Sequence, residues 1–211
     1  MPRPINRLYT FATPSATFFA SNVTGAIWIL TNTTIGDNTG HLIAIKNDSV
    51  TDHSGKTALL TGTDENNNLQ TETITLPTGS TTVTSTKYFK TLTSIIPSAS
   101  IGADTMDIGI ASSGSAMSQW FPLNYHDRKG RVSFVCTVTG TINYTIQQTQ
   151  NNIMQSVYPT TFANIDDTTL INATTSQNGA YETTPTAIRI KINSYSTGAT
   201  LKFDLLDAGY R

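Results

Sequence analysis

The residues that could carry chemistry are few and widely spaced. The 211 residues include three histidines and one cysteine, which are His41, His53, His126 and Cys136. No histidine stands at metal-ligand spacing from another histidine or from the cysteine. His53 lies in a turn rich in hydroxyl and carboxyl groups, which we expect to be exposed, and His126 begins a His-Asp-Arg run typical of a surface or interface segment. The histidines therefore predict no metal site.

Nucleophilic catalysis has equally little support. Cys136 alternates in an apolar row with Phe134 and Val138, which is typical of a small buried residue in a strand. The chain has no Gly-x-Ser-x-Gly elbow and no glycine-rich loop with the lysine of a phosphate site. Six loop carboxylates do not follow the Asp-x-Asp-x-Asp-Gly spacing of a calcium loop: Asp64, Glu65, Asp104, Asp107, Asp166 and Asp167. We therefore expect no enzyme activity, no cofactor and no metal ion.

The composition favours strands and a neutral surface. The chain has 39 threonines, a β-branched residue that suits pleated, half-hydrated surfaces, and only 13% charged residues. A net charge of -1 argues against a nucleic-acid partner and against a disordered acidic tail. The apolar run at 26–30 is far shorter than the roughly 20 residues of a membrane span. Without the apolar run of a signal peptide, we expect a soluble protein that is made in a cytoplasm and has no membrane partner.

Alternating apolar and polar residues predict strands along most of the chain. Prolines at positions 2, 4 and 14 predict an extended arm with a short strand, of the kind that becomes ordered on a partner. The apolar run at 26–30 predicts a strand covered on both faces. Segments 56–63 and 69–76 flank a polar five-residue loop and predict a hairpin.

The second half of the chain has the clearest β pattern. Apolar residues alternate along 132–138, 142–146, 188–192 and 201–205, with Arg189 expected on the outer face. Small residues followed by an aromatic stretch with a proline predict a linker before this half. The expected fold is all-β, with two antiparallel β-sandwich-like modules and an extended N-terminal arm. Its parts are an arm over 1–20, a module over 21–112, a linker over 113–130 and a second module over 131–211. A single larger sandwich is the alternative.

One stretch resembles a hairpin of tailed-bacteriophage virion proteins. It reads TGTDENNNLQTETITL at 61–76 and STKYFKTLTSI at 85–95, with Asn66 to Asn68 where the family usually has glycine and Leu92 where it usually has valine. Segments 140–149 and 184–190 are similar to other structural modules of such particles. The resemblance implies a non-enzymatic structural protein of the virion, assembled in the cytoplasm of a bacterial host.

Within that class, the sequence favours a capsid decoration or cement protein that binds the lattice of the major capsid protein. We expect the chain to associate with itself, as a homotrimer in this case, and to contact the shell through arm residues Arg3, Arg7, Tyr9 and Phe11. A tail or head-to-tail connector component is one alternative. A carbohydrate-binding adhesive module is another, in which sugars would stack on Trp120, Tyr125, Tyr158 or Tyr181.

Overall fold

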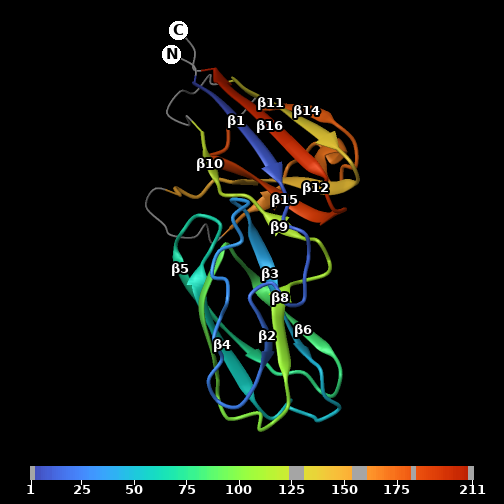
Figure 1. Ribbon diagram of the computed structural model, residues 1–211. Coiled ribbons are helices and arrows are strands. Elements are labelled where there is room, and N and C mark those ends of the chain that lie inside the picture. The colour runs from blue at the N-terminus through green and yellow to red at the C-terminus, as the bar shows by residue number, and fades with distance from the viewer. Residues whose placement is uncertain (1–2, 124–130, 154–160, 182–183, 209–211) are drawn as a thin grey trace. The chain divides into compact units, whose positions relative to one another are not determined.

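The computed structural model describes residues 3–123, 131–153, 161–181 and 184–208, and these residues confirm the all-β expectation. Strands make up 54% of the residues that the structure describes, and these residues contain no α-helix. One short 3-10 turn, η1, spans Thr168–Leu170. The chain divides into two compact units (Figure 1), which we call unit 1 (Met1–Phe11 with Met117–Arg211) and unit 2 (Ala12–Ala116).

Unit 2 contains two antiparallel sheets that enclose one apolar core. In the first sheet β3 pairs with β6 and β8, and β8 pairs with β2; in the second, β4 pairs with β5 and β7. The strands of the first sheet are β2 (Ala20–Val23), β3 (Gly40–Asn47), β6 (Thr82–Phe89) and β8 (Met106–Ile110). Those of the second are β4 (Thr57–Thr63), β5 (Leu69–Thr75) and β7 (Thr91–Pro97). Both sheets contribute wholly buried side chains to the core, including Ile43, Leu60 and Ile108, so the unit is sandwich-like.

The predicted hairpin of unit 2 is confirmed, whereas the predicted strand at 26–30 is wrong. Strands β4 and β5 pair from Thr57↔Thr75 to Thr63↔Leu69. The 26–30 segment is irregular, because Gly25 turns the chain at a positive φ and exchanges hydrogen bonds with Ile101 and Gly102 instead of joining a ladder. Only Trp28 of this segment is buried, between the exposed Ile27 and Ile29.

Unit 1 also contains two antiparallel sheets, and it brings together the two ends of the chain. Its first sheet has the order β1-β16-β11-β14, and in its second sheet β15 pairs with β12 and β10, and β12 pairs with β13. The first sheet consists of β1 (Arg3–Thr10), β11 (Arg131–Thr139), β14 (Gln177–Tyr181) and β16 (Thr200–Ala208). The second contains β10 (Phe121–Pro122), β12 (Ile142–Thr149), β13 (Ala163–Asn164) and β15 (Ala187–Tyr195). A two-residue strand, β9 (Ala116–Met117), lies where the chain passes from unit 2 into unit 1.

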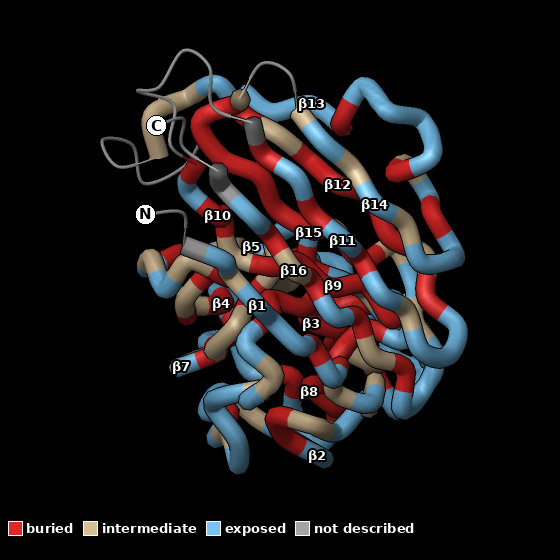
Figure 2. Tube along the Cα trace, turned by 90° about the horizontal axis from the view of Figure 1, so that it is seen from above, coloured by how far each residue is buried: buried red, intermediate tan, exposed pale blue. Residues whose placement is uncertain are grey.

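The apolar rows predicted in the second half form the core of unit 1. Leu201, Phe203 and Leu205 alternate as buried residues along β16, and Ile188, Ile190 and Ile192 are buried along β15. Figure 2 shows buried and exposed positions alternating along several of these strands. This alternation places one side of each strand in the core and leaves the other side for other contacts.

The expected arm and linker need correction. Instead of an independent arm over 1–20, residues 3–10 form β1, which pairs with β16 without interruption from Arg3↔Asp207 to Thr10↔Thr200. The physical reason is that Tyr9 and Phe11 supply an apolar surface that the core of unit 1 buries. The linker expected at 113–130 contains β9 and β10, while its residues 124–130 lie outside the described residues. The units therefore differ from the expected modules 21–112 and 131–211.

Candidate functional site

His41 belongs to a buried polar cluster of unit 2 that holds a loop in place. Its Nε2 lies 2.7 Å from Asp37 Oδ2 and 2.9 Å from the hydroxyl of Thr39. That hydroxyl donates to Asp37 Oδ1, and the other carboxylate oxygen accepts the backbone N–H of Ala12. Because a carboxylate only accepts, Nε2 must carry the proton, so His41 is not poised to remove one from Thr39. The arrangement is structural rather than a catalytic triad.

The same cluster predicts acid sensitivity of unit 2. Burial by itself would raise the pKa of Asp37, but the hydrogen bond and charge of His41 and the amides of Ala12 and Thr39 hold that pKa below its ordinary value of 3.8. A lowered pKa in the folded state stabilises the fold above the unfolded pKa, and this contribution is lost as the pH falls through the folded pKa. We expect the melting temperature of unit 2 to fall below about pH 4, and Asp37→Asn to flatten that dependence while costing about 1–3 kcal/mol at pH 7. Thermal melts between pH 3 and 7 measure this, and equal acid slopes for the two proteins would contradict it.

His53 is buried, which corrects the expectation of an exposed turn. Its Nε2 lies 3.0 Å from Asp104 Oδ2, and its Nδ1 lies 3.3 Å from the ammonium of Lys56. An ammonium can only donate, so Nδ1 accepts and Nε2 donates to Asp104. A hydrogen bond from Thr51, ahead of that from His53, holds the pKa of Asp104 below its ordinary value. Both ring nitrogens of His53 are thus engaged, and the bond from Nε2 to Asp104 joins two distant parts of unit 2.

The other loop carboxylates for which the structure gives contacts also have structural partners. Asp64 accepts hydrogen bonds from the backbone and side-chain nitrogens of Asn66 and Asn68, which fixes the loop of the β4–β5 hairpin. Asp107, which was predicted in a loop, lies instead in β8, where it is buried and accepts the N–H of Asn22. Asp167 accepts the N–H of Thr169 at the start of η1. Among the residues that the structure describes, no group of three or more His, Cys, Asp or Glu side chains could hold a metal ion.

Cys136 occupies the buried position that its apolar row predicts. Its side chain is wholly buried, and burial raises the pKa of the thiol to about 12, so almost no thiolate forms near neutral pH. The hydroxyl of Tyr144 lies nearby and donates to the carbonyl of Thr175. Cys136 therefore acts as a small core residue.

Arg189 was expected on an outer face but is buried between two aromatic rings. Its guanidinium carbon lies 4.4 Å from the ring centre of Trp120 and 4.6 Å from that of Phe162. Its Nε donates to the side-chain oxygen of Gln147 at 2.9 Å. Sequence alternation missed this cluster, because its members come from segments far apart in the chain and both faces of β15 are covered. The stack covers the Trp120 ring, so that ring offers no open platform for a sugar.

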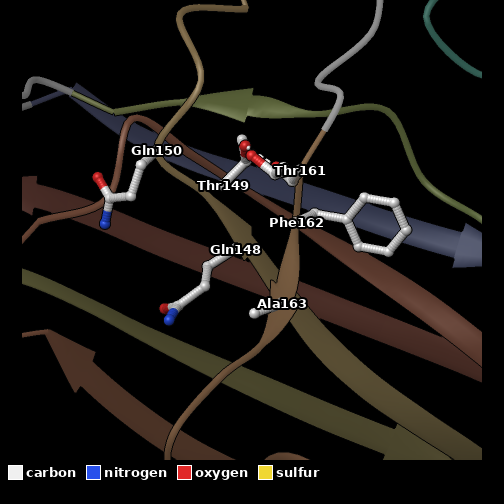
Figure 3. Close-up of a pocket in the computed structure, with 6 residues that line it drawn as sticks. All are labelled: Gln148, Thr149, Gln150, Thr161, Phe162 and Ala163. Carbon is white, nitrogen blue, oxygen red and sulfur yellow. Dashed lines mark hydrogen bonds between the residues drawn. The ribbon is translucent and has the colours of Figure 1, made fainter.

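A hollow of about 210 Å³ lies beside this cluster, lined by Gln148, Thr149, Gln150, Thr161, Phe162 and Ala163 (Figure 3). Figure 3 shows the amides of Gln148 and Gln150 on one side and the Phe162 ring pointing to the other. Within the part of the chain that the structure describes, the hollow thus has no aromatic ring facing its polar groups, as a sugar site normally would. Of the remaining candidate sugar platforms, Tyr181 is partly buried, and Tyr125 and Tyr158 lie outside the described residues.

The four residues expected to contact a shell are not equally available. Tyr9 and Phe11 are buried in unit 1, where Phe11 stacks on Tyr195 with ring centres 4.8 Å apart. Burial raises the pKa of the Tyr9 hydroxyl to about 12. Arg7 is exposed, and the side chain of Arg3 lies outside the part of the structure that is described. Tyr9 and Phe11 are therefore core residues rather than contacts for a partner.

Large apolar side chains are instead exposed at other positions. In unit 2, Ile27 and Ile29 are 80% and 75% exposed on either side of the buried Trp28. In unit 1, Leu8, Val135 and Leu206 are exposed on the outer side of the first sheet. These side chains are candidates for contact with other molecules, because they lie near one another within each unit and burial by a partner would remove their exposure to water.

These features define an all-β protein of two β-sandwich-like units, with its buried histidines and cysteine engaged in internal contacts. No protein-family model and no curated protein matches the chain. Across the described residues, no helix has the length and apolar character needed to cross a membrane.

Proposed function

We propose that this chain is a non-enzymatic structural protein of a tailed-bacteriophage particle, specifically a decoration protein that binds the lattice of the major capsid protein. The observation that carries the proposal is which side chains are buried and which are exposed. Both described histidines and the cysteine are buried within the units, while large isoleucine and leucine side chains face outward. Such a distribution fits a protein that works by burying surface against neighbours.

The segment that resembles phage virion proteins adds support. Residues 61–76 contain most of the β4–β5 hairpin, and residues 85–95 contain the end of β6 and most of β7. Glu72 in this hairpin accepts the backbone N–H groups of Thr86 and Lys87 and so ties the two parts of the segment together. The quoted motif thus corresponds to one connected substructure of unit 2. On this proposal the chain is made and assembled in a bacterial cytoplasm and needs no cofactor.

The isoleucines beside Trp28 are the proposed contact with the shell in place of the arm. Hydrogen bonds at Gly25 and Thr31 fix both ends of their segment, so the backbone that carries the two side chains has little entropy left to lose on binding. We expect the double variant Ile27→Asp/Ile29→Asp to reduce capsid occupancy at least tenfold while leaving the melting temperature within a few degrees. Co-sedimentation with capsids that lack the protein measures the occupancy.

A matched control is Val50→Asp, which adds a carboxylate at another highly exposed apolar position of unit 2. The control should retain wild-type occupancy. If the double variant binds as well as wild type, or if the control loses as much binding, Ile27 and Ile29 are not the contact.

The number of copies per particle tests the proposal itself. Decoration of a whole head requires several hundred copies, whereas a tail or connector ring requires about six to twelve. Quantitative mass spectrometry of purified particles, with the major capsid protein as the internal standard, gives this number. A count near the ring value would replace the decoration role by a tail or connector role, and the absence of the chain from particles would refute a structural role.

A further inference from the structure

The outer side of the first sheet of unit 1 forms a continuous exposed face, which we call the outer face. It carries the side chains that alternate with the buried rows of β1, β16 and β11. Its members include Pro4, Asn6 and Leu8, then Lys202, Asp204 and Leu206, then Ser133, Val135 and Thr137. We infer that this face binds a second copy of the chain, face to face, about a two-fold axis. The inference does not rest on the proposed function, since it concerns the purified protein.

The outer face combines protruding apolar side chains with a hollow of suitable size. Leu8 is 66% exposed, and Val135 and Leu206 are 44% and 42% exposed. A hollow of about 250 Å³ lies in the same face, and Pro4, Asn6, Val135 and Leu206 are among its lining residues. A leucine side chain would fit a hollow of this volume. A surface with both a projection and a hollow can be complementary to itself, which an isologous contact requires.

The charges on the outer face select one arrangement of the two copies. Lys202 and Asp204 are neighbours on this face of β16, with the ammonium 2.7 Å from the carboxylate. A two-fold axis that runs across the strands at the level of Phe203 places Lys202 of each copy opposite Asp204 of the other. An axis along β16 would instead place each charged residue opposite its own counterpart, and like charges repel. Charge complementarity therefore favours antiparallel stacking of the two sheets.

The strand register shows that this arrangement also pairs an apolar side chain with the hollow. Leu8 lies beside Lys202, and Asn6 lies beside Asp204. The axis that pairs the charges therefore also places Leu8 of each copy opposite Asn6 of the other, at the edge of the hollow. The Leu8 side chain of each copy thus meets the hollow of the other copy, and the two-fold axis makes this contact twice. The register of the strands does not have to change for it.

The size of the outer face indicates a contact of modest strength. Strands about 4.8 Å apart with a rise of about 3.3 Å per residue give the three strands, over about eight residues each, a projected area on the order of 400 Å². A standard stable interface buries about 800 Å² per partner. We therefore expect a dissociation constant in the micromolar range.

Sedimentation velocity with two charge variants tests the inference. Lys202→Asp leaves two acidic positions on the outer face, and Asp204→Lys leaves two basic ones, so each variant alone should dimerise at least tenfold more weakly than wild type. Mixing the two variants places a carboxylate opposite an ammonium at both positions and should restore a heterodimer. The wild-type chain and the mixture should both show dimers between about 1 and 200 µM.

The ion pair Lys46–Asp48 of unit 2 provides a matched control, because its members are also two residues apart. Lys46 lies in β3 and Asp48 directly follows the end of that strand. Lys46→Asp and Asp48→Lys should leave dimerisation unchanged. A wild-type chain that stays monomeric, or that forms the trimer expected for a decoration protein without passing through a dimer, overturns the inference. It is also overturned if the single outer-face variants dimerise normally or if their mixture does not associate.

Discussion

Gly109→Ala is expected to destabilise unit 2 by about 3 kcal/mol or more, which is a large part of the roughly 5–15 kcal/mol that stabilises a typical domain. A Cβ atom at position 109 would lie 1.9 Å from the carbonyl oxygen of Ser15 and 2.3 Å from the carbonyl carbon of Ala16. Both contacts are with backbone, which cannot rotate away as a flexible side chain would. The neighbouring hydrogen bonds, from Phe19 to the carbonyl of Ile108 and from Ile110 to that of Ser15, hold this backbone in place. Relief of the clash would break these bonds and expose the core beneath them.

Denaturant unfolding followed by circular dichroism measures this effect, and Gly55→Ala is the matched control. A Cβ atom at position 55 would have no heavy atom within 4 Å, and Gly55 does not require a positive φ. The control should therefore change stability by less than about 1 kcal/mol. If Gly109→Ala were as stable as the control, the close approach of residues 15–16 to β8 would be wrong.

Phe203→Ala is expected to cost about 3–5 kcal/mol in unit 1. The Phe203 ring is wholly buried, with ring centres 5.2 Å from that of Phe121 and 5.7 Å from that of Phe134. These three residues come from both sheets of the unit, so the ring fills the space between the sheets. Its removal leaves a cavity where those sheets meet, and the loss includes both the burial of the ring and its aromatic contacts.

The control for this prediction lies on the same strand. Leu206→Ala removes a side chain from the exposed side of β16 and should cost about 1 kcal/mol or less. Chemical denaturation that resolves the two units should show the unfolding transition of unit 1 at a lower denaturant concentration in the Phe203 variant, while the transition of unit 2 is unchanged. A loss no larger than that of Leu206→Ala would mean that Phe203 does not occupy the centre of the core.

Several features follow from the sequence alone, because they depend on local alternation. The rows at 188–192 and 201–205 predict which residues are buried, since side chains on a strand alternate between its two faces. The same reasoning places Cys136 in the core and the five-residue loop of the β4–β5 hairpin after Thr63. The abundance of threonine and the lack of a helical period are sufficient for the all-β class.

Other features required the tertiary structure, because they join residues that are distant in the sequence. Alternation at residues 8–13 predicts a short strand, whereas the strand in the structure is β1 at Arg3–Thr10. No local pattern shows that its partner is β16, almost 200 residues later. The burial of His53 depends on Asp104, and that of Arg189 depends on Trp120 and Phe162. In each case a polar residue is buried because a partner from elsewhere in the chain satisfies it, and alternation carries no information about that partner.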